Sequence, residues 1–201
     1  MKVYFAPDTR ALRTVWLLEE LGLPYELERY ELGSKAMRSP EYLAINPNGR
    51  VPTLDDGPVR LSESTAIAQY LVARYGEGRL APAVAAPEFP VYLQWLHYAE
   101  GMIMPPVATI MVETVLLPPE RRNADNLTRA RKLLNRTLAP LEAHMAGRDY
   151  LAGDFTAADT VTGHAVLVAR TLGADLSDKP NLEAYAGQLQ ARPAFRRALA
   201  A

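Results

Sequence analysis

The sequence predicts an α/β domain at the N-terminal side of the chain, followed by an all-α domain. Strand-like segments are confined to the first 75 or so residues, and only helical patterns follow them. Residues 76–87 are rich in glycine, proline and alanine, and they break the pattern. The 201 residues, 49% of them hydrophobic, suffice for two small cores. We therefore expect a domain over residues 1–75, a linker over 76–87 and a helical domain over 88–201.

The first domain is expected to contain four strands and three helices. In chain order these are a strand over Lys2–Phe5, a helix over Ala11–Leu21 closed by Gly22, a strand over Tyr25–Tyr30, a helix over Pro40–Ile45 capped by Ser39, a hairpin of Val51–Leu54 and Val59–Leu61 with its turn at 55–58, and a helix that begins at Ser62 or Glu63. Two strands joined through a helix form a parallel, right-handed βαβ unit. The order βαβ-α-ββ-α fits a thioredoxin-like domain.

The second domain is expected to be built from helices that proline punctuates. A helix over 87–115 contains Pro105 and Pro106, which should kink it, and a helix over 120–145 contains Pro140. Thr156 is the expected cap of a further helix, with the Asp159 carboxylate accepting from the cap's own N–H. Two short helices follow, each opened by a proline, at Pro180 and Pro193.

Composition excludes several kinds of chemistry. The chain has no cysteine, so disulfides, thiolate metal sites and a cysteine nucleophile are absent. Three histidines lie far apart in the sequence, and we expect no metal site. The net charge is −1, and we expect no block of basic residues that exceeds the acidic residues around it, so we expect no nucleic-acid partner. Met1 leads directly into a strand and every apolar run looks too short to cross a bilayer, so we expect a soluble, cytoplasmic protein without a membrane partner.

The segment around Pro52 indicates where a ligand binds. Pro52 falls where a strand should begin, which favours a strand start, an edge or a cis peptide bond. With a cis bond, the N–H and C=O of Val51 would point outward and pair with an extended peptide. The next helix would present free N–H groups together with Glu63 and Ser64. The sequence thus predicts a site for a small peptide that carries carboxylates.

Asn46-Pro-Asn-Gly-Arg-Val-Pro, followed by Leu61-Ser-Glu-Ser-Thr-Ala-Ile, resembles the glutathione-binding half of the cytosolic glutathione transferases, especially the bacterial members. The Thr156–Asp159 segment and the tail resemble the same family, so the likeness spans nearly the whole chain. It implies a cis Pro52 and glutathione as co-substrate, with no metal. The implied ligand contacts are Val51 to the cysteinyl backbone, Glu63 to the γ-glutamyl ammonium, Ser64 to its carboxylate, and Arg50 or Lys35 to the glycyl carboxylate. For Arg50, a solvated loop charge is an almost equal alternative.

The resemblance places the thiol-activating group between the first strand and the first helix, where this chain has Thr9 and Arg10. Lowering a thiol pKa from about 8.5 to about 6.5 requires roughly 2.7 kcal/mol of thiolate stabilisation. One hydrogen bond to an anion contributes about 1.5–3 kcal/mol. A hydroxyl aided by a helix dipole, or a guanidinium, would therefore suffice. We favour Thr9 over Arg10; the alternative is that Thr9 only caps the helix.

A second substrate is expected against the proline-containing helix. Five residues fall at helical spacing and are expected to form one face: His97, Gly101, Met104, Ala108 and Met111. Such a methionine stripe is also typical of a plain core. The resemblance implies that Met104 lines the electrophile pocket, with Ala108 and Met111 beside it. It further implies a two-fold homodimer in which His97 reaches the partner's glutathione. An ordinary surface or interface histidine is an equal alternative for His97.

The resemblance implies a detoxifying enzyme that transfers glutathione to apolar alkyl or aryl electrophiles. Two other activities on the same site stay open, namely peroxide reduction and disulfide reduction, and so does a non-catalytic binding module on the same fold. The sequence does not identify the electrophile.

Overall fold

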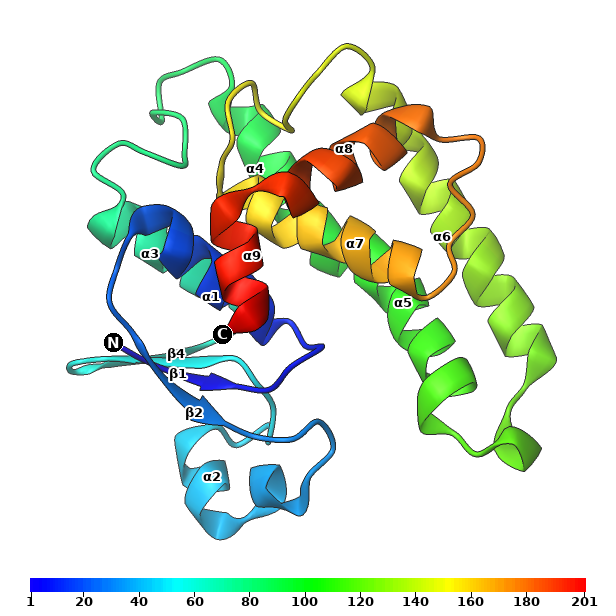
Figure 1. Ribbon diagram of the computed structural model, residues 1–201, viewed down its shortest axis with the longest axis horizontal. Helices are drawn as coiled ribbons and strands as arrows, with labels where there is room; N and C mark the ends of the chain where they lie inside the picture. Colours follow the sequence, from blue (N-terminus) through cyan, green and yellow to red (C-terminus); the bar gives the residue numbers. More distant parts are fainter. The chain divides into compact units, whose positions relative to one another are not determined.

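The computed structural model describes residues 1–201, which divide into two compact units (Figure 1). The first unit comprises residues 1–81 together with 191–201, and the second comprises 82–190. The expected architecture, a thioredoxin-like α/β domain followed by helices, is confirmed.

A four-stranded mixed sheet forms the centre of the first unit. Its strands are β1 (Lys2–Phe5), β2 (Glu26–Arg29), β3 (Thr53–Asp56) and β4 (Val59–Ser62). They lie in the order β2-β1-β3-β4, with β1 parallel to β2 and β3 antiparallel to both of its neighbours. The parallel pair is the βαβ unit that the sequence predicts.

Helices cover both faces of this sheet. The helices of the unit are α1 (Ala11–Leu21), α2 (Pro40–Ile45), α3 (Ser64–Tyr75) and α9 (Pro193–Ala200), with a 3₁₀ turn over Lys35–Arg38 before α2. Figure 1 shows α1, α3 and α9 on one side of the sheet and α2 on the other. The caps follow the sequence: the Ser39 hydroxyl accepts from the Tyr42 N–H, and Gly22 closes α1 in the left-handed conformation with φ 71°.

The hairpin differs from the expectation in its turn and its ends. Strand β3 begins at Thr53, after Pro52, and the turn comprises only Gly57 and Pro58. Asp55 lies in the strand because its carboxylate is held there, 2.6 Å and 2.8 Å from two nitrogens of Arg60 in the paired strand. Helix α3 begins one or two residues later than expected, at Ser64.

The end of the chain also differs from the expected boundary, which placed all of residues 88–201 in the helical domain. Helix α9 instead packs against α1 of the first unit. The Phe195 ring meets the Trp16 ring edge-on, with centroids 4.8 Å apart, and Arg192 forms a bidentate ion pair with Glu20 at 2.7 Å and 2.8 Å. These contacts join residues far apart in sequence, so no local pattern reports them.

The second unit consists of helices. They are α4 (Phe89–Tyr98), α5 (Met104–Met111), α6 (Ala124–Met145), α7 (His164–Thr171) and α8 (Pro180–Ala191). Three π-helical turns, Ala99–Ile103, Val112–Leu116 and Asp159–Gly163, extend α4, α5 and α7. The first of these turns lies directly before Pro105 and Pro106, where the sequence predicts a kink, and its wider backbone accommodates prolines that do not fit a regular α-helix.

Together α4, α5 and their π turns make one helix from Phe89 to Leu116 that is long and apolar enough to cross a membrane by length and composition. This differs from the expectation that every apolar run is too short. Part of the helix is buried against α6 and α7, as in the core helix of a helical bundle.

Candidate active site

The pairing of the strands brings three predicted segments to one edge of the sheet. Thr53, the first residue of β3, pairs with Ser62 at the end of β4 and with Tyr4 near the end of β1. The residues just beyond these pairs are therefore neighbours. They are Val51 and Pro52 before β3, Glu63 and Ser64 after β4, and the turn that follows β1 and holds Thr9 and Arg10.

The loop before Pro52 is fixed by hydrogen bonds to its backbone. The Arg50 carbonyl accepts from the Tyr42 hydroxyl at 2.6 Å and from the Asn46 side-chain amide at 2.8 Å. Gly49 has φ 58°, and a Cβ there would lie 2.7 Å from the Met37 carbonyl oxygen, so this turn requires glycine. These contacts give the Asn46-Pro-Asn-Gly segment a single conformation.

The Val51–Pro52 peptide bond is cis, which confirms the expectation. Val51 is half-buried, and its N–H and C=O make no hydrogen bond within the chain. An unpaired donor and acceptor on one residue are the groups with which a sheet edge accepts another extended chain. The edge at Val51 can therefore pair with a peptide.

The start of α3 carries Glu63 and Ser64 in different environments. Glu63 is exposed, and its backbone has φ 75°. Ser64 is 3% exposed, and its hydroxyl accepts from a guanidinium nitrogen of Arg13 at 3.1 Å. The hydroxyl of Thr65, in the same turn, is buried and has no hydrogen-bond partner. With the free N–H groups of a helix start, this turn offers donors to an anion.

Arg13 is a residue that sequence reasoning missed. It lies on α1, is fully buried, and places its positive charge directly against Ser64. The signal in the sequence is a lone arginine inside the apolar stretch of residues 11–18, where a charge needs a specific polar partner.

The turn after β1 uses the Thr9 hydroxyl within the chain. This hydroxyl donates to the Ala6 carbonyl at 2.7 Å and accepts from the Ala11 N–H at 3.1 Å. A threonine hydroxyl has one proton, so Thr9 can donate to a thiolate only by giving up its bond to Ala6. The observed geometry is that of a helix cap. Arg10, half-buried, is the last residue before α1.

Three cations surround the loop that precedes Val51. Arg50 is exposed, and so is Lys35, which opens the 3₁₀ turn. Sequence reasoning passed over Arg38, which is also exposed and has a guanidinium nitrogen 3.2 Å from the Cβ position of Gly49. Of the two cations in the 3₁₀ turn, Arg38 is the one for which a contact with the loop is observed.

The five residues of the expected electrophile face fall into two groups: Met104, Ala108 and Met111 share one face of α5, whereas His97 lies in α4 and Gly101 in the π turn between the two helices. Met104 is 6% exposed, whereas His97, Gly101 and Ala108 are exposed and Met111 is half-buried. The π turn over Ala99–Ile103 widens the helix and rotates every later residue relative to α4, so the α5 group is offset from His97. Spacing based on 3.6 residues per turn fails across such a turn.

Thr156 and Asp159 meet in the core of the second unit. The Asp159 carboxylate accepts from the Thr156 N–H at 2.8 Å, as the capping pattern predicts, and also from the Leu151 N–H at 3.0 Å and the Tyr185 hydroxyl at 2.7 Å. Asp159 is completely buried, and burial raises its pKa against the opposing effect of these hydrogen bonds. Its contacts are those of a structural group.

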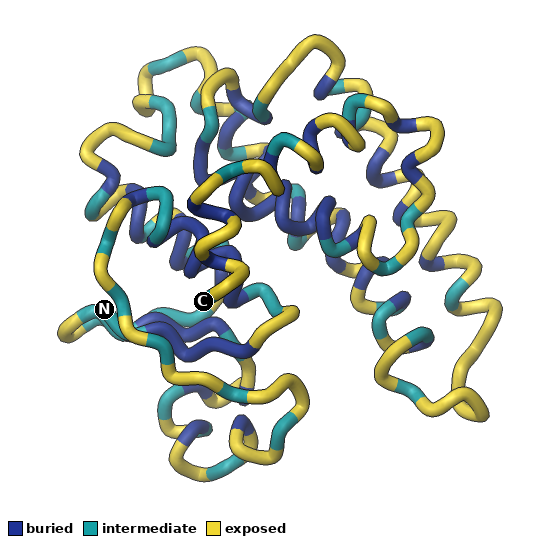
Figure 2. Tube along the Cα trace, in the orientation of Figure 1, coloured by how far each residue is buried: buried dark blue, intermediate teal, exposed yellow.

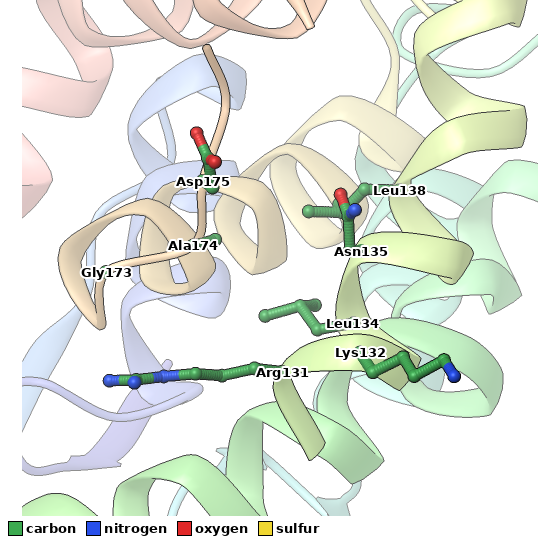
Figure 3. A pocket seen from close by; sticks show the side chains of 8 residues that line it. All are labelled: Arg131, Lys132, Leu134, Asn135, Leu138, Gly173, Ala174 and Asp175. Carbon is green, nitrogen blue, oxygen red and sulfur yellow. The ribbon is translucent and has the colours of Figure 1, made fainter. Parts of the chain in front are cut away.

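A cavity of about 270 Å³ lies on the second unit, between α6 and the segment after α7 (Figure 3). Its lining includes Arg131, Lys132 and Asn135 from α6 and Asp175 from the opposite side. It contains none of the residues that the sequence predicts for a site. Among the described residues, no group of three or more side chains is suited to hold a metal ion.

The fold and the sheet edge together are those of a glutathione-binding, thioredoxin-like domain joined to a helical domain, and comparison with known proteins agrees. Residues 1–73 match the family model of the glutathione S-transferase N-terminal domain, and residues 103–193 match that of the C-terminal domain. Glutathione S-transferase 3 of Zea mays is 35% identical over all of this chain and 94% of its own length. Glutathione S-transferase GstB of Escherichia coli K12 is 32% identical over 94% of this chain and 92% of its own length.

Solved structures give the same result. The glutathione transferase URE2P6 of Phanerochaete chrysosporium, in complex with oxidised glutathione, has a TM-score of 0.87 and 28% identity, and the match covers 98% of this chain and 93% of that one. The chain therefore belongs to the glutathione S-transferase family. It is a glutathione transferase with glutathione as its co-substrate.

Proposed function

We propose that glutathione binds along the sheet edge at Val51, with its γ-glutamyl end at the start of α3. The observation that carries the proposal is the strand pairing, since Thr53 pairs with both Ser62 and Tyr4. Val51 pairs with the cysteinyl backbone, and the exposed Glu63 carboxylate takes the γ-glutamyl ammonium. Ser64 and the N–H groups of α3 take the γ-glutamyl carboxylate, with the buried charge of Arg13 behind them.

The glycyl carboxylate lies toward the loop at Arg50, in this proposal. Arg50 and Lys35 are the cations assigned from the sequence, and Arg38 joins them because its guanidinium lies against Gly49. Replacing Arg38 or Lys35 by glutamine separates their roles. If Arg38 holds the carboxylate, its variant raises the KM for glutathione while the Lys35 variant leaves it near the wild-type value.

At the thiol end, we assign thiolate stabilisation to Arg10 and the N-terminus of α1, and a positioning role to Thr9. This reverses the preference from sequence, because the Thr9 proton is already bonded to Ala6. The test is the pKa of the bound thiol, followed by thiolate absorbance. Arg10→Gln should raise the pKa of the bound thiol by about one to two units, since a charge-assisted hydrogen bond contributes about 1.5–3 kcal/mol. A larger shift in Thr9→Val than in Arg10→Gln would restore Thr9 as the activating group.

The reaction proposed is attack by the glutathione thiolate on an apolar alkyl or aryl carbon that carries a leaving group. A carbon–sulfur bond forms, the bond to the leaving group breaks, and the thiol proton passes to solvent. Met104, Ala108 and Met111 remain the proposed contacts for the electrophile. Ala108 is exposed and Met111 is half-buried, so these two side chains can touch a ligand from the surface, and the 6% exposed Met104 would form the floor beneath it.

Retention on immobilised glutathione, followed by conjugation of an activated aryl halide, tests the whole assignment. The matched pair is Ser64→Ala, which removes a proposed ligand group, and Ser62→Ala, which removes a hydroxyl two residues earlier on the paired strand. Only the first should lose retention. Equal loss in both, with the fold intact, would place glutathione elsewhere.

A second candidate activity is disulfide reduction. It is supported by the complex of the 28% identical P. chrysosporium relative with oxidised glutathione. This chain has no cysteine, so the thiolate of bound glutathione must itself attack the mixed disulfide of glutathione and a small thiol, which yields oxidised glutathione and releases the other thiolate. Peroxide reduction by the same thiolate is a related alternative. Comparing kcat/KM for a mixed disulfide, a hydroperoxide and the aryl halide ranks the three candidate activities.

We further propose that the enzyme is a cytoplasmic homodimer that acts in detoxification, as the resemblance to its family implies. The exposed position of His97 on α4 is compatible with a role at a subunit interface. Sedimentation equilibrium of the wild type and of His97→Ala tests the dimer and the part that this residue plays in it.

A further inference from the structure

Although the net charge of the chain is near neutral, one segment of it is strongly basic. Residues 121–136 contain six of the 22 basic residues of the chain but only one of its 23 acidic residues. This corrects the expectation that no basic block stands out. Three of these side chains, Arg129, Lys132 and Arg136, are spaced i, i+3 and i+7 along α6 and therefore share one face of the helix. We call them the basic face of α6.

The basic face points to solvent. The buried residues of α6 lie on its other side, and they are Ala130, Leu134, Thr137, Leu138, Leu141 and Met145. The three cations are exposed, and none of them forms an ion pair or a hydrogen bond within the chain. Figure 2 shows the exposed strip that runs along α6 and through the connection before it.

The acidic groups nearby do not pair with the basic face. Glu113, at the end of α5, is buried, and its carboxylate accepts from the Asn123 N–H at 2.7 Å and the Asn126 side-chain amide at 3.1 Å. Asp125 and Glu120 are exposed near the start of α6, and neither forms an ion pair. The face thus keeps an excess of positive charge that the chain does not neutralise.

Aliphatic side chains project beside these cations. At the end of α5, Val115 is 57% exposed and Leu116 is 58% exposed, and Leu133 on α6 is 43% exposed. The connection from α5 to α6 adds the exposed Arg121 and Arg122. Figure 1 shows this connection as the tip of the α5–α6 hairpin. Exposed aliphatic residues at a tip with cations around and behind them are typical of a surface that rests on a membrane.

We propose that the basic face of α6 and the adjoining tip bind an anionic lipid surface. Clusters of four to eight basic residues on a helix attract acidic phospholipids, and aliphatic residues can enter the boundary between headgroups and acyl chains. This association is peripheral and compatible with a cytoplasmic enzyme. It differs from the expectation of no membrane partner, and it would hold the enzyme where apolar compounds concentrate.

Two other occupants fit this surface less well. A two-fold contact centred on the basic face would bring each cation toward its own copy, and like charges repel. Single-stranded nucleic acid is usually held by aromatic side chains that stack on bases, and residues 112–136 contain no aromatic residue. A lipid surface needs only cations and aliphatic groups.

The test is sedimentation of the full chain with vesicles of phosphatidylcholine alone or with about 30 mol% phosphatidylserine. The wild type should bind the anionic vesicles at about 0.05 M salt and lose binding at about 0.5 M, where screening is strong. Each basic residue near the surface raises binding roughly fivefold. The triple variant Arg129→Gln, Lys132→Gln, Arg136→Gln should therefore bind on the order of 100-fold more weakly.

A control variant changes the net charge equally at exposed arginines elsewhere: Arg74→Gln, Arg148→Gln, Arg196→Gln. It should bind nearly as well as the wild type. A second variant, Val115→Ser, Leu116→Ser, keeps all charges and should weaken vesicle binding severalfold. Aryl-halide conjugation and circular dichroism should be unchanged in all three, which separates lost binding from lost fold.

Several outcomes would overturn the proposal. Wild-type protein that fails to sediment with anionic vesicles at low salt rules it out, as does equal loss in the control variant, which would indicate a net-charge effect. Tighter binding to a DNA duplex than to vesicles would assign the face to nucleic acid. A change of oligomeric state in the first triple variant would assign it to a subunit interface.

Discussion

Asp159 holds several groups of the second unit together, and its removal should cost more than the loss of a helix cap. In Asp159→Ala, four buried donors lose their acceptor: the N–H of Leu151, the N–H and the hydroxyl of Thr156, and the hydroxyl of Tyr185. A buried donor left without a partner costs about 1–3 kcal/mol. A simple cap, by comparison, contributes about 1 kcal/mol.

The expected loss of stability in Asp159→Ala is smaller than the sum of these costs, because burying the Asp159 charge is itself unfavourable. Burial raises the pKa of Asp159 and its hydrogen bonds lower it, so part of what these bonds contribute offsets the loss of water around the carboxylate. We therefore expect a loss of about 3–5 kcal/mol, a large part of the stability of an ordinary domain. Urea unfolding followed by circular dichroism measures it, with glutathione absent so that ligand binding does not contribute.

Two further variants keep the experiment informative if Asp159→Ala fails to fold. Tyr185→Phe removes one donor and leaves the carboxylate with its other partners, so we expect a loss of about 1 kcal/mol. Asp159→Asn keeps the size and one acceptor oxygen, and it should fall between the two. A loss of 1 kcal/mol or less in Asp159→Ala would refute the reasoning and reduce Asp159 to a cap.

Three other predictions concern the first unit. Ser64→Ala should raise the KM for glutathione roughly 10- to 100-fold with a smaller change in kcat, because a hydrogen bond to an anion contributes about 1.5–3 kcal/mol. An unchanged KM in steady-state kinetics would exclude the contact between Ser64 and the γ-glutamyl carboxylate. Phe195→Ala should cost about 3 kcal/mol or more in urea unfolding, because a 5% exposed ring that packs on Trp16 leaves a cavity; a loss under 1 kcal/mol would mean that α9 is loosely attached. Hydrogen bonds from Arg60 first, and then from Tyr4, lower the pKa of Asp55. The contact between Arg60 and Asp55 therefore stabilises the fold above the ordinary aspartate pKa, and this stabilisation is lost as pH falls through the lowered value. The stability difference between wild type and Arg60→Gln should thus be present at neutral pH and shrink below pH about 4, and a difference independent of pH would contradict the ion pair.

Much of the fold could be predicted because its signals are local. The Gly22 and Ser39 caps and the prolines that open α2, α8 and α9 act on residues a few positions away. The segment from Asn46 to Pro52 is the clearest case, since Asn46, Gly49 and Pro52 are each suited to the backbone conformation that the structure shows there. Asn46 donates to the Arg50 carbonyl, and Gly49 has a positive φ.

The proximity of the candidate-site residues was predictable in part. Val51, Glu63 and Ser64 could be placed together because a short hairpin joins them, and strand pairing fixes which residues meet at its open end. Arg13 could not, because its contact with Ser64 spans 51 positions. Thr9 shows a different limit: the sequence predicts a hydroxyl at the start of α1, but only the structure shows that its proton is bonded to Ala6.

By itself, then, the sequence determined the order of the helices and strands, the position of the loop with the cis Pro52 bond, and the family. Periodicity, caps and turn residues act over a few residues, so they can be read without the fold. Tertiary structure alone decided that α9 packs on α1, that a π turn splits the expected substrate face, and that the cations of α6 stay unpaired. Those features depend on which distant side chains meet, and burial and charge pairing are settled only when the chain packs.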